Sequence, residues 1–566
     1  MALNARLAAP RRWLPLLALV LSLPLCFKPF SDPDLPWHLS AARWIVEHRA
    51  VPRADFLSWT KEGKPWVDFE WGAQLALYGL ERAGGDRALW LFKSGGFALL
   101  LVCLLLLLRR WKTPELWSAA VLPPMALVFA PYLNARPEMF SVFLCLAQFA
   151  LLEELREGRI KPSFVLFGGQ LLLYALWANL HGAFPVGLGL CVLYGLEGGL
   201  LGRVCAGLAF SGLAGTLLNP YGWYIYRVFI EHAQHKELLR QHIIEWSDIP
   251  ISSLAQVPYW TLLFFSFGMG LAAVWQGIVL PRAHLAALLV LGLFGSSHFR
   301  HSIYVPLLLV PLALKIGLGL SAPVGLRRVI YAAAAVLALG AGLAGWDIAR
   351  ATGGLRLAQN PDLKIPFEAC AFLRGEKAAL GGIKLYNTYN WGGFLGYELY
   401  PDYKVFIDGR YLFADMLAEP HPPAGGAPAW RRLVERYGIQ AALIEIHRPL
   451  YQVFRGQLSP WRPFDVYSMP RSEWALVYWD DLAMFFVKRE AVPIDWLKRH
   501  EFRHLRPGDL QVLGRRVVAG QVPYIEVARE IERFRRQANA PLELERLDAW
   551  KTELRRELGF VRPSAS

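Results

Sequence analysis

Long apolar runs separated by short polar turns dominate the first 346 residues of the chain. A helix that spans a bilayer needs about 20 mostly apolar residues, and about eleven runs approach that length. The first run follows three arginines, as in a signal peptide, but no small-x-small cleavage site comes after it, so we expect a retained anchor. The pattern therefore predicts a polytopic α-helical membrane domain over residues 1–346. Its expected spans lie near 13–29, 88–108, 116–133, 139–154, 163–178, 183–201, 204–218, 259–280, 284–299, 302–320 and 328–346.

The pattern changes after residue 347, where short β-like runs replace the long apolar ones. Strands that alternate with helices indicate a small α/β domain over residues 347–490. Residues 525–558 are charged, have a helical pattern and are interrupted by Pro541, so we expect a helical C-terminal extension over residues 491–566. The expected strands lie at 383–386, 405–407, 441–446, 474–478 and 484–487, with a helix at 430–437 and a hairpin turn at Asp480–Asp481.

The composition agrees with a membrane domain. Of the 566 residues, 55% are hydrophobic and 19% are charged, whereas about 25% are charged in a typical soluble domain. The formal net charge of +14 would also suit a protein that binds nucleic acid. The charges are unevenly spread, however, with a net +9 in residues 1–346 and a net +5 in the rest.

The basic residues of the membrane domain gather in alternate short turns, while the opposite short turns hold only Arg136 and Arg300. Because Lys and Arg favour the cytoplasmic side, the N-terminus is expected in the cytoplasm of a multi-pass cytoplasmic (inner) membrane protein. With an odd number of spans, the C-terminal domain is then extracytoplasmic. Much of the charge thus marks topology, and nucleic acid is not an expected partner. The basic turns contain Arg109, Arg110, Lys112, Arg156, Arg159, Lys161, Arg203, Arg282, Arg327 and Arg328.

With this topology the distinctive polar residues collect at the outer ends of many helices. A membrane protein that concentrates ionisable groups in this way is building a functional site. The glutamates of the basic turn, Glu153, Glu154 and Glu157, are instead expected to be solvated partners of its arginines. The candidate site residues beside Asp32 and Asp34 are His38, Asp68, Glu70, Arg136, Glu138, His181, Asn219, Tyr221, Glu245, His298, Arg300 and His301.

The first outer loop, at about 30–87, is the longest within the membrane domain. Pro36 can occupy the first turn of a helix, and Leu39, Ala42, Ile45 and Val46 then form an apolar stripe, which predicts a helix in the membrane interface. Three interpretations of the two aspartates before it stay open. They cap the helix, one of them is a general base of raised basicity, or they bind a divalent metal such as Mg²⁺ or Mn²⁺ together with His38 and Glu70.

The outer arginines and histidines also have two interpretations. A guanidinium meets a phosphate through two hydrogen bonds, which favours Arg136 and Arg300 as anion ligands. An arginine at a helix end can equally snorkel to the interface. His298 and His301 flank Arg300 and favour a functional site there, whereas His181 is either a helix cap or a ligand of phosphate or hydroxyl.

Several of these features together resemble one family. They are the Asp-x-Asp element at the start of a long first outer loop, the interfacial helix, the turn at 48–53 and the acidic element Trp66-Val67-Asp68-Phe69-Glu70. This arrangement is similar to the GT-C superfamily of polytopic membrane glycosyltransferases. It most resembles the branch that contains protein O-mannosyltransferases and the lipid A aminoarabinose transferase.

The resemblance implies a sugar donor carried on a polyprenyl phosphate and an acidic pair that acts on the acceptor. Asp34 would then be the catalytic base with Asp32 beside it, and Asp68 and Glu70 would be supporting acids. The branch has an adjacent Asp-Glu pair where this chain has Asp-Pro-Asp, so the choice of base stays open. Oligosaccharyltransferases share the superfamily but carry a Trp-Trp-Asp motif in their soluble domain, which is absent from this sequence.

The expected α/β domain has two stretches that could bind carbohydrate. Each follows an expected strand, where ligand sites of α/β sheets lie. In the alternative interpretation Trp391 belongs to the core and Gly392-Gly393 is a close helix contact. The candidate binding residues are Asn387, Asn390, Trp391, Asp408 and Arg410.

The sequence thus predicts a membrane glycosyltransferase that moves a sugar from a polyprenyl-phosphate donor to an extracytoplasmic glycan, lipid or protein in the cell envelope. A general base on the acceptor and cations on the departing phosphate suit a single displacement with inversion. The alternatives are a transporter or translocase of lipid-linked glycans, whose charges would lie near the bilayer midplane, and a metal-dependent enzyme like the oligosaccharyltransferases.

Overall fold

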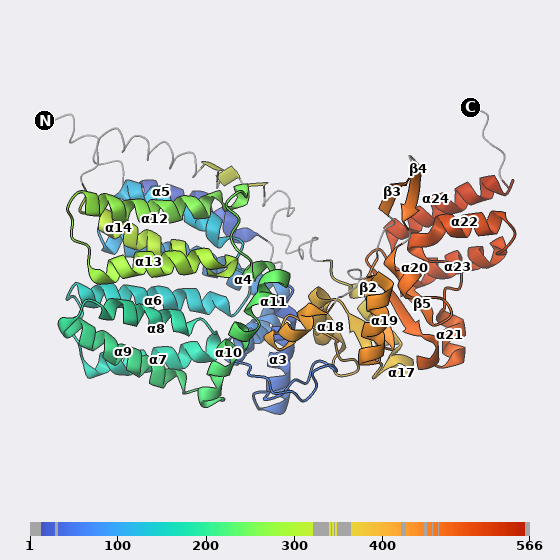
Figure 1. Cartoon of the computed structure of the whole chain (residues 1–566), viewed down its shortest axis with the longest axis horizontal. Helices are drawn as coiled ribbons and strands as arrows, with labels where there is room; N and C mark the ends of the chain where they lie inside the picture. The colour runs from blue at the N-terminus through green and yellow to red at the C-terminus, as the bar shows by residue number, and fades with distance from the viewer. Residues whose placement is uncertain are drawn as a thin grey trace. The chain divides into compact units, whose positions relative to one another are not determined.

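The computed structural model of the chain describes residues 13–28, 32–320, 339–340, 342–343, 346–347, 364–419, 426–446, 450–454, 457–461 and 463–560. It divides into two compact units (Figure 1). The first unit is formed by Met1–Pro52 with Val67–Leu363, and the second by Arg53–Trp66 with Lys364–Ser566. A short segment of the expected first outer loop therefore belongs to the second unit. Most of the expected span at 328–346 lies outside the described residues.

The first unit is helical, and Figure 1 shows its long helices lying side by side. Close packing joins α7 to α9, α2 to α5 and α12 to α14. Its elements are α2 (Leu14–Ser22), η2 (Leu23–Phe27), α3 (Leu35–His48), α4 (Trp71–Arg110), α5 (Glu115–Phe129), α6 (Glu138–Arg156), α7 (Phe164–Leu180), α8 (Phe184–Gly195), α9 (Gly199–Thr216), η3 (Gly222–Tyr226), α10 (Arg227–Gln234), α11 (Lys236–His242), η4 (Ile244–Trp246), η5 (Leu254–Gln256), α12 (Val257–Trp275), α13 (Arg282–Ser297), η6 (Phe299–His301), η7 (Val305–Leu309) and α14 (Val310–Gly317).

The outside of this bundle is apolar. Large hydrophobic side chains such as Phe164, Phe210, Trp275 and Leu293 are exposed on it, and a soluble monomer rarely exposes extensive apolar surface. Among the described helices, four are long and apolar enough to cross a membrane, and five shorter ones are apolar. The chain is therefore a multi-pass membrane protein, as the apolar runs predict.

The helix predicted in the first outer loop is present as α3, with Pro36 in its first turn. Leu39, Ala42 and Ile45 are buried, but Val46 is exposed and does not belong to the apolar stripe. Helix α4 begins at Trp71, well before the expected span at 88–108, and is kinked where Gly84 and Gly85 leave helical geometry. The first outer loop is therefore shorter than expected, because its second half is already helical.

The second unit is a small mixed sheet covered by helices, with strand order β1-β2-β6-β5. β1 pairs with β2 in parallel, and the other pairs are antiparallel. The Asp480 carboxylate accepts hydrogen bonds from two backbone N–H groups in the predicted hairpin turn between β5 and β6. Its elements are α16 (Phe367–Gly375), α17 (Lys377–Leu380), β1 (Leu385–Asn387), α18 (Tyr389–Leu399), η8 (Tyr411–Ala418), α19 (Gly426–Tyr437), β2 (Ala441–Glu445), β3 (Leu450–Phe454), β4 (Gln457–Trp461), α20 (Phe464–Ser468), β5 (Trp474–Trp479), β6 (Ala483–Lys488), η9 (Arg489–Ala491), α21 (Ile494–His500), η10 (Pro507–Asp509), α22 (Leu510–Val518), α23 (Tyr524–Gln537) and α24 (Pro541–Glu557).

One expected strand, at 405–407, pairs differently. Val405 forms an isolated parallel bridge with Ser58 of the short segment from the first outer loop. The apolar run correctly indicated an extended backbone whose N–H and C=O groups pair with another segment. Its partner comes from a part of the sequence almost 350 residues away.

The expectation that Glu153 is solvated is wrong. Its side chain is fully buried, and it accepts hydrogen bonds from Tyr194 at 2.5 Å and pairs with His284 at 2.7 Å. Lys315 also forms an ion pair with it. Burial of a carboxylate is tolerated because several donors from α8, α13 and α14 surround it.

Helix α18 approaches the loop after it very closely at Gly392. A Cβ atom added there would lie 1.9 Å from the Ile407 carbonyl oxygen and 2.8 Å from the Asp408 Cα. This is the close helix contact that the glycine pair suggested.

We therefore expect Gly392→Ala to destabilise the second unit by about 1–3 kcal/mol, since backbone atoms must move apart. Thermal unfolding followed by tryptophan fluorescence measures the effect. Gly375→Ala is the matched control, because a Cβ atom there meets nothing within 4 Å. Equal unfolding temperatures for the two variants would contradict the prediction.

Candidate active site

Arg136 lies at the centre of a polar cluster in the first unit. Its Nη2 donates to Asp32 Oδ1 at 2.6 Å and to Asp34 Oδ2 at 3.0 Å. Its Nη1 donates to Glu245 Oε1 at 2.8 Å, and its Nε to Asp32 Oδ2. One guanidinium therefore holds three carboxylates, of which Glu245 is more than 200 residues away from the other two in the sequence. All four residues were predicted site residues, and the structure brings them together.

The two aspartates have different surroundings. Both Asp32 oxygens accept from Arg136, Oδ1 also accepts from the Asp34 backbone N–H at 2.9 Å, and the side chain is fully buried. Asp34 precedes α3, accepts from Arg136 through one oxygen, and keeps 27% of its side chain exposed. Asp34 is thus the member of the pair that an incoming molecule can reach.

Burial raises the pKa of Asp34 to about 7, and the nearby charges of Asp32 and Glu245 act in the same direction, while Arg136 opposes them. An ordinary aspartate has a pKa of about 4 and is fully ionised at neutral pH. Asp34 exchanges a proton near pH 7 instead. A pKa close to the working pH is the property that a general acid or base needs.

A second guanidinium, that of Arg300, extends the cluster. Its Nη1 lies 3.7 Å from Glu245 Oε2, so Glu245 bridges the two arginines. Burial acts to raise the pKa of Glu245, but Arg136 and Arg300 outweigh it and lower that pKa. The Arg300 side chain is 33% exposed, against 12% for Arg136. Arg300 is therefore the cation with more surface for an anionic ligand.

Glu70 and two histidines form the next part of the site. Glu70 Oε1 lies 3.6 Å from His181 Nε2, and Oε2 lies 3.9 Å from His38 Nδ1. Burial, with the charges of Asp68 and Asp34, raises the pKa of Glu70 to about 8. Burial also lowers the pKa of both histidines. At neutral pH Glu70, His38 and His181 are therefore largely uncharged, and Glu70 can donate a proton.

Asp68 is held by Gln74 of α4 and by Tyr221, which precedes η3. Gln74 Nε2 donates to its carboxylate at 2.6 Å and lies 3.4 Å from His38 Nδ1. The Tyr221 hydroxyl accepts from the Asp68 backbone N–H at 3.0 Å and donates to the Pro52 carbonyl at 2.6 Å. Asn219 lies one step further away and supports the turn, since its Oδ1 accepts from the Tyr221 N–H at 2.7 Å.

The remaining predicted residues lie at the edge of the cluster. Glu138 is buried in the first turn of α6 and interacts electrostatically with Arg300. The His301 ring stacks on Phe294 with centroids 4.0 Å apart, and the His298 ring lies 5.8 Å from that of Trp246. These histidines pack among aromatic rings beside Arg300.

A metal ion bound by Asp32, Asp34 and His38 does not fit this arrangement. Arg136 already supplies positive charge to both aspartates, and His38 faces Gln74 and Glu70. Within the described residues no group of three or more His, Cys, Asp or Glu side chains is placed to hold a metal.

Most candidate residues of the second unit are buried and bonded within it. The Asn387 amide donates to the Ile407 carbonyl at 2.8 Å, and its oxygen accepts from the Phe406 N–H at 2.7 Å. The Trp391 indole N–H donates to the Lys364 carbonyl at 2.7 Å. Asp408 and Arg410 pair with each other, whereas Asn390 is exposed.

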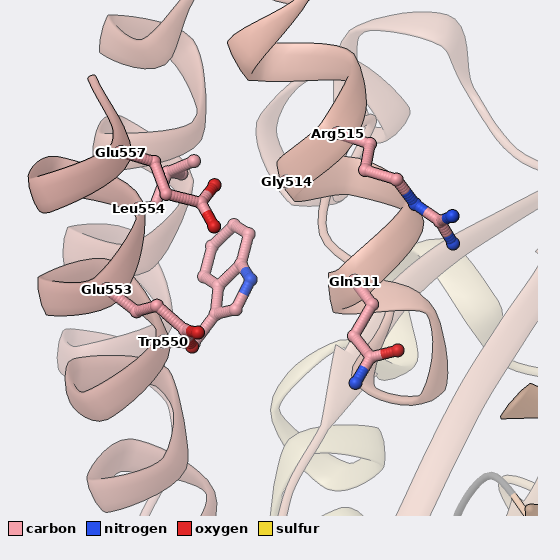
Figure 2. Close-up of a pocket in the computed structure, with 7 residues that line it drawn as sticks. All are labelled: Gln511, Gly514, Arg515, Trp550, Glu553, Leu554 and Glu557. Atoms are coloured by element: carbon pink, nitrogen blue, oxygen red, sulfur yellow. The ribbon is translucent and has the colours of Figure 1, made fainter. Parts of the chain in front are cut away.

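The pocket drawn in Figure 2 lies between α22 and α24 and has a volume of about 320 Å³. The Trp550 indole points toward α22, with the carboxylates of Glu553 and Glu557 on the same side. A second pocket of about 310 Å³ is lined by Arg471, Arg506, Arg516 and their neighbours. The predicted carbohydrate-binding residues line neither pocket.

Sequence reasoning missed two residues of the site, Gln74 and Ser141. Gln74 follows Glu70 by one helical turn, so its position one turn into α4 was a usable signal. Ser141 Oγ lies 2.8 Å from His181 Nδ1 and accepts from the Trp177 indole N–H at 2.6 Å. Ser141 lies inside an apolar run and had no such signal.

Comparisons with family models and with curated proteins found no match. Among solved structures, the archaeal oligosaccharyltransferase AglB from Archaeoglobus fulgidus, in complex with an inhibitory peptide and a dolichol-phosphate, matches with a TM-score of 0.55 and 10% identity. The match covers 92% of this chain and 83% of that chain. The oligosaccharyltransferase of the same organism, tethered to an acceptor peptide, matches with a TM-score of 0.51 and 11% identity over 86% of this chain and 80% of that one.

ArnT from Cupriavidus metallidurans, bound to undecaprenyl phosphate, matches with a TM-score of 0.46 and 14% identity, over 84% of this chain and 98% of that chain. The fold assignment follows from the two oligosaccharyltransferase structures. The chain therefore has the fold of these oligosaccharyltransferase structures.

The raised pKa values of Asp34 and Glu70 can be tested without a substrate. Infrared difference titration of the protein should reveal carboxyl groups that ionise near pH 7 and pH 8. Asp34→Asn should remove the first and Glu70→Gln the second. A spectrum of Asp34→Asn identical to that of the wild type between pH 6 and 8 would refute the assignment.

Proposed function

We propose that the chain is a GT-C membrane glycosyltransferase that moves a sugar from a polyprenyl-phosphate-linked donor to an extracytoplasmic acceptor. The single observation that carries the proposal is Asp34, a reachable carboxylate with a pKa of about 7 that pairs with Arg136, which in turn shares Glu245 with Arg300. One related fold holds a dolichol-phosphate, which supports a lipid-linked donor. The multi-pass bundle places the chain in a membrane, which is also where a lipid-linked donor resides.

In this proposal Asp34 is the general base. It takes the proton from an acceptor hydroxyl while the acceptor oxygen forms a bond to the anomeric carbon. The bond between that carbon and the phosphate oxygen breaks, and the electron pair leaves with the polyprenyl phosphate. A single displacement of this kind inverts the configuration of the sugar carbon.

Arg136 and Arg300 have separate roles. Arg136 is saturated by three carboxylates and fixes the position and pKa of Asp34. Arg300 has one carboxylate partner at 3.7 Å and greater exposure, so it is suited to the charge that develops on the departing phosphate.

The location of the polar groups disfavours a transporter or translocase. Asp32 and Asp34 precede α3, Arg136 lies between α5 and α6, and Arg300 follows α13. Coupling charges of transporters lie near the bilayer midplane on broken helices. The basic turns expected on the opposite side support a cytoplasmic N-terminus in the inner membrane and an extracytoplasmic site. We also propose about eleven spans.

Replacing the proposed base should slow transfer strongly. We expect Asp34→Asn to lower the rate of sugar transfer from a radiolabelled polyprenyl-phosphate donor by at least ~10²-fold, since general base catalysis contributes roughly 10²–10⁴-fold. Asp248→Asn is the control, because this acid is exposed and pairs with Arg240 rather than with the cluster. Undiminished transfer by Asp34→Asn would remove this carboxylate from the mechanism.

The dependence of transfer on pH should follow the raised pKa. Asp34 acts only when ionised, so kcat/KM is expected to be constant well above pH 7 and to fall about tenfold per pH unit well below it. An aspartate with an ordinary pKa of about 4 would leave the profile flat from pH 5.5 to 8. A flat profile over that range would therefore exclude Asp34 as the base.

A further inference from the structure

The segment Arg53–Trp66, called the strap below, leaves the first unit and belongs to the second. It folds back on itself, since the Asp55 N–H donates to the Lys64 carbonyl at 2.9 Å and the Trp66 N–H to the Arg53 carbonyl at 3.0 Å. Its two ends therefore lie close together. The chain departs at Pro52 and returns at Val67.

The strap completes the second unit. The Trp59 N–H donates to the Val405 carbonyl, and the Val405 N–H donates to the Leu57 carbonyl, both at 3.1 Å. The Trp59 indole N–H donates to the Leu385 carbonyl of β1 at 2.9 Å. Leu57 is buried against Gly396, where an added Cβ atom would lie 2.9 Å from the leucine side chain.

Arg410 holds both limbs of the strap. Its Nη1 lies 2.7 Å from Asp55 Oδ1, while its Nε and Nη2 donate to the two Asp408 oxygens at 2.7–3.0 Å. Its guanidinium carbon lies 4.7 Å from the centre of the Trp66 ring. The three ionic side chains are at most 1% exposed. A buried charge triad of this kind fixes position strongly, because both carboxylates would be unpaired without Arg410.

The base of the strap is fixed in the first unit. The Tyr221 hydroxyl donates to the carbonyl of Pro52, the residue before the strap, and accepts from the N–H of Asp68, the second residue after it. Asp68 in turn accepts from Gln74, whose amide reaches toward His38. Glu70 follows two residues later, so the return point of the strap leads directly into the acidic site.

We infer that the second unit positions the acids Asp68 and Glu70 through the strap. Arg410 and Tyr221 are then positioning residues for sugar transfer. The inference rests on the proposed function for its kinetic consequence. It assigns the buried Asp408–Arg410 pair a task other than ligand binding. A structural role confined to the second unit would instead leave the first unit unaffected when the triad is broken.

Hydrogen exchange on the full-length protein tests the inference without any activity. We expect Asp55→Asn to increase amide exchange both in the strap and in Val67–Gln74, while β2 and β6 keep their protection. Asp415→Asn is the matched control, because Asp415 pairs with Lys61 of the strap but is 53% exposed. Faster exchange in the strap with unchanged exchange in Val67–Gln74 would overturn the inference.

Kinetics supply the second readout. Asp55→Asn and Arg410→Lys should each lower kcat at least tenfold with a donor KM within about twofold of the wild type, since misplacement of about 1 Å can cost 10²-fold. Tyr221→Phe should behave similarly. The double variant Asp55→Asn/Tyr221→Phe should lose no more activity than the less active of the two single variants. Both changes interrupt the same connection, so their effects should not multiply. Multiplicative losses would show independent effects and contradict the inference.

The outcomes separate the two proposals. A wild-type protein without transfer activity would defeat the proposed function, yet the exchange result for Val67–Gln74 would still decide whether the strap positions those residues. If Arg410→Lys also loses the protection of β2 and β6, Asp55→Asn alone carries the test. Normal kcat in Asp55→Asn, with exchange in Val67–Gln74 raised, would exclude a role in transfer.

Discussion

Three buried or half-buried carboxylates cannot lie together without a cation, and Arg136 meets this requirement for Asp32, Asp34 and Glu245. Asp32 and Asp34 lie between η2 and α3, Arg136 lies between α5 and α6, and Glu245 lies in η4, so this ion cluster joins three distant parts of the chain. Removing it would leave unpaired charges in a poorly solvated site. The geometry of the whole cluster therefore depends on this side chain.

The same ion cluster gives two chemically identical carboxylates, those of Asp32 and Asp34, different surroundings. Asp32 uses both oxygens on Arg136 and is inaccessible, whereas Asp34 is held through one oxygen and stays partly exposed. The negative charges of Asp32 and Glu245 add to the effect of burial on Asp34.

Sequence reasoning could predict the elements because their signals are local. Apolar runs, a proline in the first turn of α3 and β-like runs with a turn at Asp480–Asp481 each reflect a periodicity or a backbone preference. Sequence reasoning could also predict that the polar residues lie at one end of the bundle. It could not divide the roles of Asp32 and Asp34, detect the buried surroundings of Glu153, or see that Val405 pairs with Ser58. Those outcomes depend on contacts between residues that are far apart in the chain.

This chain has Asp-Pro-Asp where the branch that it resembles has an adjacent acidic pair. The structure gives a physical reason for that spacing. Pro33 has no N–H group, so the first backbone donor after Asp32 is that of Asp34, and it bonds to the Asp32 carboxylate at 2.9 Å. That bond turns Asp32 back onto its own chain, where Arg136 meets both of its oxygens. The extra residue then places Asp34 just before α3, where its carboxylate keeps contact with Arg136 and 27% exposure together. An adjacent pair has no such turn between its members, so the insertion is what allows one acid to be anchored while the next remains available.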